Sequence, residues 1–313
     1  MADNNSLVGG ESLMQKISKQ VIIFQGFIAL FLCVNLSLIT TFFMRDFFYT
    51  SMRYILFANT LLSDSLILIL TNMLFICSYF HFTMPMWLCI IIYIVLSLYI
   101  FVTPVTLTAM TLERYVAICM PLRHGELCSS RSAIHSILII HGLSSAPCIV
   151  VLSIFFSSAS LSFYTQYSAC SVEIFILYRW QEHLRSAVCQ FYFLIMYITI
   201  IFCYVKIMKV AKSASGENKK SSWKRLRTVI LRGFQLMLCL IQLWCPFIEA
   251  AIFHINVMLY INVRHFNYIT LYLAPRCLSP LIYGIRDETF FLALKYYVLC
   301  GFVKNKVIIK RVC

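Results

Sequence analysis

Charged residues are scarce in this sequence: Asp, Glu, Lys and Arg together make up 12% of its 313 residues. A soluble domain carries about twice that fraction, so the scarcity argues against a soluble protein. Hydrophobic residues make up 61% of the chain, and its mean hydropathy is +0.85. Apolar runs of roughly 20 residues recur, the length that a helix needs to cross the ~30 Å hydrocarbon core of a bilayer. Because lipid cannot hydrogen-bond to the backbone, these runs should be helices, and we predict an all-α, multi-pass membrane protein.

Negative charge is particularly rare, with 12 Asp and Glu against 26 Lys and Arg, for a net charge of +14. An excess of positive charge can indicate nucleic-acid binding. In a membrane protein it is better explained by Lys and Arg concentrated in cytoplasmic loops. We therefore expect the lipid membrane, and no nucleic acid, as a partner.

The sequence also lacks the motifs of metal centres and hydrolases. Its 14 Cys show no CxxC pair or Cys/His spacing, so most should be small buried hydrophobes. No Ser stands in a GxSxG setting, and His135 and His141 share one apolar run without catalytic partners. We therefore expect no metal and no enzyme. The polar first 20 residues show no cleavable signal peptide, and the absence of an internal repeat weakens a transporter interpretation.

The apolar runs predict seven spans. The third is about 30 residues long, or ~45 Å as a helix, so its far end must project into the interface or the helix must tilt. The predicted spans are residues 21–44, 54–79, 88–118, 134–156, 188–208, 229–253 and 266–285. We expect one domain over 21–285, preceded by an extracellular segment, 1–20, and followed by a cytoplasmic segment, 286–313.

The distribution of Lys and Arg predicts the orientation. With the N-terminus outside, the inner segments hold 20 of the 26 Lys and Arg, the outer segments hold five, and Arg276 lies within the seventh span. Positively charged residues favour the cytoplasmic side, so the N-terminus should be extracellular and the C-terminus cytoplasmic, in the plasma membrane. The sequon that begins at Asn4 would then lie outside, where glycosylation takes place.

Two features suggest sites of interest. Asp64 lies near the middle of the second span, where an ionisable residue marks an ion or switch site by default but can also act as structural glue. Its partners at similar depth would be Asn35, Thr103 and Ser279. Cys89 begins the third span on the outer side, and a disulfide to Cys170 in the following outer loop suits that oxidising side. Cys189 is the competing partner.

The C-terminal segment has an amphipathic pattern. In "RDETFFLALKYYVLC", residues 286–300, the residues Phe290, Phe291 and Leu294 share an apolar face. Such a pattern is typical of a helix lying on the inner leaflet, and Cys300 is a candidate for palmitoylation. The predicted fold is therefore a seven-transmembrane helix bundle with a short amphipathic eighth helix.

Several motifs resemble those of rhodopsin-like G-protein-coupled receptors: seven spans, an outer Cys at the head of span 3, and "ERY" 24 residues later. The longer string "TLERYVAICMPLRH", residues 111–124, resembles the olfactory receptor signature MAYDRYVAICxPLRY, with Leu112-Glu113 for Tyr-Asp and His124 for the last Tyr. "LLSDSL" at 61–66, "FCYVKI" at 202–207, "LWCPF" at 243–247 and "SPLIYGIRD" at 279–287 extend the likeness. Taken together, the sequence looks most like the fish-type odorant receptors.

The resemblance implies a small odorant ligand and a heterotrimeric G protein of the olfactory Gs type. It implies that Trp244 and Pro246 form a pivot about which the inner part of span 6 swings. The implied activation switch is Glu113, Arg114, Tyr115, Tyr204, Trp244, Pro246, Pro280 and Tyr283. The implied ligand pocket is Tyr93, Leu96, Ser97, Ile100, Phe101, Val188, Tyr192, Phe247, Ile248, Ala251, Ile269 and Tyr272.

The resemblance implies no cofactor except a sodium ion near Asp64, although Ser279 and Pro275 replace two polar ligands usual at such a site. Two other functions stay open. The chain could be a rhodopsin-like receptor for a peptide or lipid, whereas the absence of an acidic residue in outer span 3 disfavours an amine. It could also be a transporter or channel, which the missing repeat disfavours.

Overall fold

The structure is a computed structural model of the whole chain, and it describes residues 3–80, 82–170, 178–213, 216–242, 244–253, 255–276, 292 and 294. For residues 3–20 it describes the course of the backbone and not the side chains. Ser279, Pro280, Tyr283 and Cys300 lie outside the described residues, as does nearly all of the predicted eighth helix. The predictions made for these residues stay predictions.

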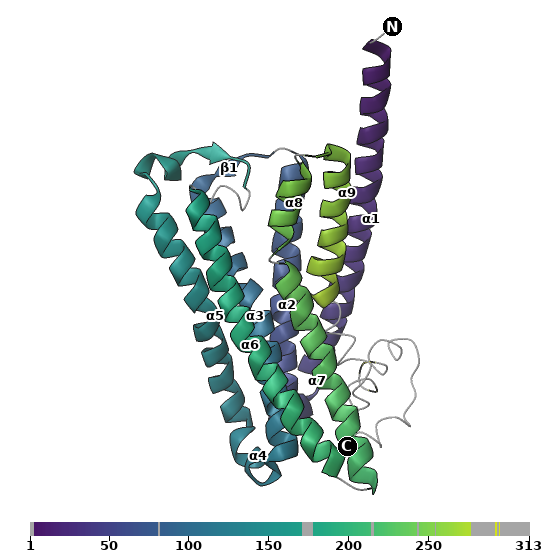
Figure 1. Cartoon of the computed structure of the whole chain (residues 1–313), viewed down its shortest axis with the longest axis vertical. Helices are drawn as coiled ribbons and strands as arrows, with labels where there is room; N and C mark the ends of the chain where they lie inside the picture. The colour runs from purple at the N-terminus through teal and green to yellow at the C-terminus, as the bar shows by residue number, and fades with distance from the viewer. Residues whose placement is uncertain are drawn as a thin grey trace.

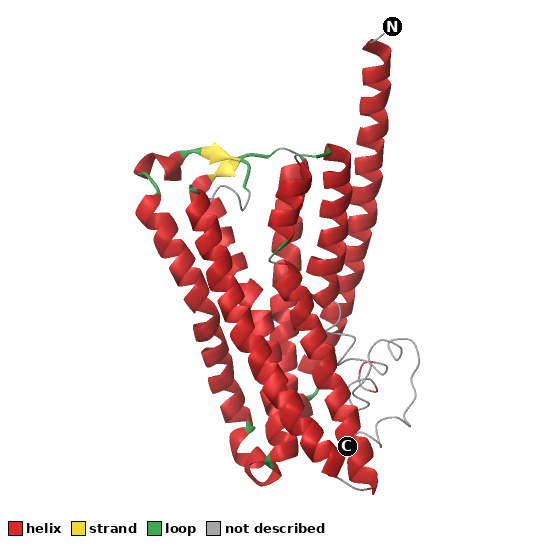
Figure 2. Cartoon of the chain, viewed as in Figure 1, coloured by secondary structure: helices red, strands yellow, loops and turns green. Residues whose placement is uncertain are grey.

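The described part of the chain is a bundle of long helices that run up and down beside one another (Figures 1 and 2). Among the described residues, five helices are long and apolar enough to cross a membrane, and they match the first five predicted spans, the first helix ending at Phe43, one residue before the predicted end. Their bounds are α1, Asp3–Phe43; α2, Met52–Tyr79; α3, Met86–Cys119; α5, Ser130–Ser158; and α6, Arg179–Ser213. The N-terminal part of α1 projects beyond the rest of the bundle (Figure 1).

The sixth and seventh passes are assembled from shorter elements. The sixth consists of α7, Gly216–Gln242, and α8, Cys245–Phe253; it ends at the predicted 253 and is interrupted next to Pro246. The helix restarts with Pro246 at its second position, where a residue without an N–H group is tolerated. The seventh begins with α9, Val257–Asn267, and continues as the π-helix η4, Tyr268–Leu273. It therefore starts nine residues before the predicted 266, at a turn where the Asn256 Oδ1 accepts the N–H of Leu259 at 3.2 Å.

Helix α3 is central, because it packs against α2, α5, α6 and α7. The side chains between these helices form the main core, in which Leu56, Leu61 and Val102 are fully buried. On the outside, large apolar side chains such as Leu138 (68% exposed) and Phe191 (65%) face away from the bundle. An apolar exterior of this extent marks a surface that contacts something apolar, and on helices of this length it is the surface that faces lipid.

Many hydroxyl side chains inside the spans donate to a carbonyl of their own helix. Thr60 donates to the Leu56 carbonyl at 3.0 Å, and Ser65 donates to the Leu61 carbonyl at 2.7 Å. Pro104 interrupts the hydrogen bonding of α3 from within, and Thr108 donates to the Pro104 carbonyl at 2.9 Å. A hydroxyl inside a span is tolerated in this way, because it finds a backbone carbonyl of its own helix as a partner.

The two ends of the bundle differ. At one end, called here the strand end, strand β1, Met84–Pro85, pairs antiparallel with β2, Tyr167–Ser168, although α3, α4 and α5 separate the two strands in the chain. The 3-10 turn η2, Leu161–Thr165, comes just before β2. The 3-10 turn η1, Asp46–Thr50, connects α1 to α2. At the opposite end, α3 is followed by the short helix α4, Pro121–Leu127, which is called here the α4 end (Figure 1). Pro121 stops α3 and opens α4, since proline suits the first position of a helix.

Candidate functional site

A charged cluster lies in the middle of the bundle, around Asp64 of α2. The Asp64 side chain is fully buried, and its Oδ1 accepts a hydrogen bond from the Thr103 Oγ1 of α3 at 2.9 Å. The same oxygen accepts a second hydrogen bond from the Arg276 Nη1 at 2.7 Å. Arg276 is only 6% exposed, and its Nη1 is also 3.4 Å from the Thr103 Oγ1. Three spans therefore converge on one carboxylate oxygen.

Sequence reasoning placed Thr103 beside Asp64, and the structure shows this contact. It missed Arg276, which it counted as a residue of the seventh span without assigning it a partner. The signal was available, because a cation inside a span faces the bundle interior and pairs with an acidic residue. Asn35 is buried on α1, with 2% exposure, and Ser279 lies outside the described residues.

The residues around Asp64 do not fit the sodium ion that the family resemblance implies. A hard cation needs several oxygen ligands, and Oδ1 is already held by the Thr103 hydroxyl and a guanidinium. The positive charge of Arg276 balances the single negative charge of Asp64. A second cation about 4 Å from the guanidinium would be repelled by about 4 kcal/mol at an effective dielectric constant near 20.

A second charged cluster lies at the α4 end. Glu113 of α3 is 7% exposed, and its Oε2 lies 3.5 Å from the Arg114 Nε. Its Oε1 lies 3.5 Å from the His124 Nε2 of α4, which carries a charge only when it is protonated. These distances are those of ion pairs rather than of short hydrogen bonds. One carboxylate thus faces both the arginine of "ERY" and the first helix after it.

Four of the other predicted switch residues lie within the described part of the chain: Tyr115 on α3, Tyr204 on α6, and Trp244 and Pro246 at the break between α7 and α8. Tyr115 packs its ring against Phe202 of α6, with centroids 5.8 Å apart. Tyr204 is partly buried against the main core. Trp244 lies at the break between α7 and α8, where its N–H donates to the Ile241 carbonyl at 2.9 Å. Pro246 lies in the first turn of α8, but the placement of its side chain is not described.

The strand end is held by a disulfide between Cys89 of α3 and Cys170, with Cα atoms 5.6 Å apart. This distance lies in the middle of the normal range for disulfides. The Met86 N–H also donates to the Gln166 carbonyl at 3.0 Å. Cys189 is a buried free thiol in α6. The predicted pairing of Cys89 with Cys170 is therefore confirmed, and the alternative partner is excluded.

The predicted pocket residues occupy different settings. Phe101 and Tyr192 meet edge to face, with centroids 5.7 Å apart. Leu96, in contrast, is buried against Ile67 of α2, and Tyr93 packs near the disulfide. Ser97 and Ile100 are partly buried on α3, Ile248, Ala251 and Ile269 are exposed, and the side chains of Phe247 and Tyr272 are not described.

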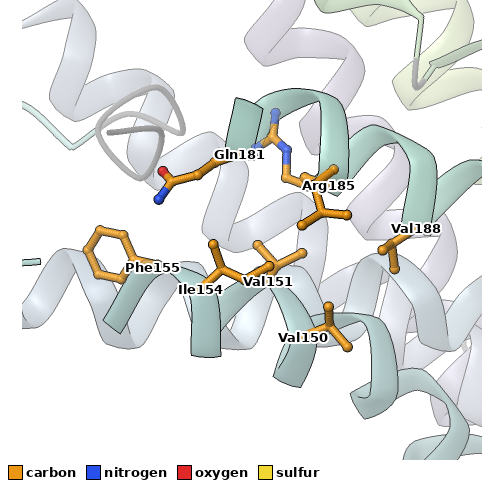
Figure 3. Close-up of a pocket in the computed structure, with 8 residues that line it drawn as sticks. Val150, Val151, Ile154, Phe155, Gln181, Arg185 and Val188 are labelled. Carbon is orange, nitrogen blue, oxygen red and sulfur yellow. The ribbon is translucent and has the colours of Figure 1, made fainter. Parts of the chain in front are cut away.

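A small crevice lies between α5 and α6, toward the strand end (Figure 3). Its lining is mostly aliphatic, with Gln181 and Arg185 projecting from α6. Of the predicted pocket residues, Val188 belongs to this lining. About 10 Å³ of the crevice is open to the centre of a water molecule, which is room for one water at most. The crevice is therefore too small to hold an organic ligand in this conformation.

A further polar contact that sequence reasoning missed joins the sixth and seventh passes. The Asn267 Nδ2 of α9 donates to the Glu249 Oε1 of α8 at 3.0 Å. Glu249 is partly buried, so the carboxylate sits in a span without full access to water. It could have been found by the same reasoning as Asp64, since acidic residues within spans are rare.

The fold and these clusters define a multi-pass helical membrane protein. It has a disulfide and a pair of short strands at one end, a buried ion pair at its centre and an arginine–carboxylate cluster at the other end. Residues 34–283 match the family described as "7 transmembrane receptor (rhodopsin family)", and the chain belongs to this family. Its members are receptors and not enzymes. The seven-helix fold predicted from the sequence is thus confirmed.

Relatives within the family narrow the comparison. The chain is 39% identical to odorant receptor 131-2 of Danio rerio over 298 residues, which cover 95% of this chain and 91% of that protein. It is 27% identical to galanin receptor 2a of Danio rerio, over 72% of this chain and 64% of that receptor. It is 21% identical to melatonin receptor type 1A of Ovis aries, over 59% of this chain and 51% of that receptor.

Proposed function

We propose that this protein is an odorant receptor that binds small molecules within its helix bundle and activates a heterotrimeric G protein of the Gs type. The observation that carries the proposal is the 39% identity to an odorant receptor over 95% of the chain. The signature string at 111–124 supports the same assignment. The galanin receptors match a shorter part of the chain at lower identity, so a peptide ligand is the weaker candidate.

In the proposed orientation, in the plasma membrane, the strand end is extracellular and the α4 end is cytoplasmic. The positive-inside rule supports it, because the nine Lys and Arg from Lys206 to Arg232 lie on and around the junction of α6 and α7. The disulfide at the strand end supports this orientation too, since disulfides persist on the oxidising side.

The ligand pocket would lie between α3, α6 and α8, near the edge-to-face pair of Phe101 and Tyr192. Aromatic and aliphatic side chains with a few polar groups suit small, largely apolar molecules. The Tyr192 hydroxyl donates to the Leu143 carbonyl at 2.6 Å, which fixes this ring against α5. A ligand activates by binding one arrangement of the bundle more tightly than the other.

The cytoplasmic partner would contact α4 and the region of Arg114. Leu122 of α4 is 99% exposed, next to the exposed Arg123. An apolar side chain held fully in water beside a positive charge is a good anchor for a partner protein, because its burial on binding is worth about 2 kcal/mol. We expect Leu122→Ala to weaken G-protein activation several-fold while ligand binding and surface expression stay unchanged.

The test is expression of the full chain in cells with a cAMP reporter, followed by a screen of odorant mixtures and of a peptide panel. A cAMP response to an odorant that is lost in Arg114→Ala, at equal surface expression, is the expected result. A response to peptides alone would favour the second candidate. A ligand-evoked current that survives without any G protein would overturn the receptor assignment.

A further inference from the structure

The ion pair between Asp64 and Arg276 bears on whether this protein binds sodium, a question separate from ligand detection. We propose that the Arg276 guanidinium is a tethered cation that takes the place of a diffusible sodium ion at Asp64. The site is then neutral without any bound metal, and sodium does not regulate this protein.

The geometry supports the substitution, because the guanidinium uses the oxygens that a small cation would use. The Arg276 Nη1 lies 2.7 Å from the Asp64 Oδ1 and 3.4 Å from the Thr103 Oγ1. Asp64 is 0% exposed and Arg276 is 6% exposed, so both charges are removed from solvent. A charge-assisted hydrogen bond of this length is a strong one.

The backbone that carries Arg276 is held in position from two sides. The buried Gln235 of α7 donates its Nε2 to the Pro275 carbonyl, at 2.5 Å. The Tyr268 hydroxyl donates to the Thr71 Oγ1 of α2 at 3.4 Å, and Leu273 packs on Leu68 of α2. These contacts hold the segment that carries Arg276 against α7 and α2.

The π-helix directly upstream explains how the arginine reaches α2. Residues Tyr268–Leu273 form a wider turn than an α-helix, and such a turn changes the face on which later residues lie. π-turns of this kind are frequent at functional positions. In this chain, the first charged residue after the turn is Arg276, and it points into the bundle at Asp64.

A tethered cation differs from a diffusible one in what it does to the bundle. A bound ion can leave when the helices rearrange, whereas Arg276 stays attached to the seventh pass. Any rearrangement that separates α2 from this segment must break a buried pair, and breaking such a pair leaves an uncompensated charge. Because the cation is covalently part of the seventh pass, it ties that pass to the second and third passes through an ion pair and hydrogen bonds.

One atom offers the strongest argument against the proposal. The Asp64 Oδ2 is buried and accepts no hydrogen bond from the residues that the structure describes. A sodium ion that bound beside Arg276 would have to use this Oδ2 oxygen. The parent protein must therefore be tested directly for sodium, and not only through variants.

The test is the melting temperature of the purified full chain in detergent, measured in NaCl and in choline chloride, each at about 150 mM, near physiological ionic strength. It requires neither ligand nor G protein, so its outcome is independent of the proposed function. We expect the parent to melt at the same temperature in both salts. A higher melting temperature of the parent in NaCl, saturating with concentration, would overturn the proposal.

Two variants complete the test. Arg276→Met removes the charge at similar length and leaves Asp64 unpaired, so we expect a lower melting temperature that NaCl raises selectively. The rise should be about 3–6 °C when sodium is at roughly tenfold its Kd. Arg276→Lys keeps a tethered charge and should stay insensitive to sodium. An Arg276→Met protein that melts like the parent in both salts would also overturn the proposal, and if this variant does not fold, the parent and the Lys variant decide.

Discussion

The disulfide between Cys89 and Cys170 allows a prediction whose size can be worked out from the structure. The bond closes a loop of 81 residues, and loop-closure entropy alone would make it worth about 4.5 kcal/mol. Much of that loop is helix, however, because α3 and α5 lie within it. Such helices persist in a bilayer even when the bundle comes apart, since lipid cannot satisfy their backbone.

The effective loop is therefore shorter than its residue count. Roughly 20 of its residues lie outside the two long helices, and for a loop of this length the same relation gives about 3 kcal/mol. The expected loss on removing the bond is then between about 3 and 4.5 kcal/mol. For a chain of this size, that loss corresponds to a fall in melting temperature of roughly 10 °C.

The assay compares Cys89→Ser, Cys170→Ser and the double variant by thermal unfolding in detergent and by surface staining of intact cells. Because both single changes break the same bond, the double variant should be no less stable than either single variant. Cys189→Ala is the matched control, since Cys189 is a buried thiol that takes no part in the bond. Additive effects of the two single changes, or an equal loss in Cys189→Ala, would refute the reasoning.

Three further changes test other parts of the molecule. Glu113→Gln removes the carboxylate that faces Arg114, so we expect the basal cAMP signal without ligand to rise several-fold, and an unchanged signal would contradict the switch. Tyr192→Phe removes the hydrogen bond to the Leu143 carbonyl and should cost about 1 kcal/mol. That cost appears as a fall in melting temperature of about 2–4 °C, and no fall would argue against the bond. Asn4→Gln should remove one glycan, seen as faster migration on a gel, whereas a parent that does not shift on endoglycosidase treatment would exclude glycosylation.

The first five spans could be predicted well, because hydropathy reports the length of chain that lipid must surround. The disulfide could be predicted from its location, since it needs two Cys on the oxidising side. The contact between Thr103 and Asp64 could be predicted from depth alone. Each of these features depends on one requirement, which is span length, location on the oxidising side or depth in the membrane, and each requirement can be read from the sequence.

The sixth and seventh passes could not be predicted in the same way. Arg264 and His265 make the stretch before 266 look like a loop, although the helix α9 already begins at Val257. An interruption of the sixth pass is expected from Pro246, whereas the π-turn at Tyr268–Leu273 depends on how the passes pack together. For this reason the partner of Arg276 was missed. That a cation inside a span pairs with an acidic residue could be expected, but the position of Arg276 opposite Asp64 follows from the π-turn and the contact of Gln235 with Pro275, neither of which has a local sequence pattern.

The break between α7 and α8 gives the sixth pass the geometry of a lever. Helix α7 runs for 27 residues from Gly216 to the break, or about 40 Å at 1.5 Å per residue. A rotation of only about 10° at the break would move the far end of α7 by about 7 Å, given that length. Displacements of this size open space at the α4 end, while side chains near the pivot at Trp244 move by a fraction of it. If the proposed ligand shifts this angle, a small change at one end of the molecule produces a much larger change at the other.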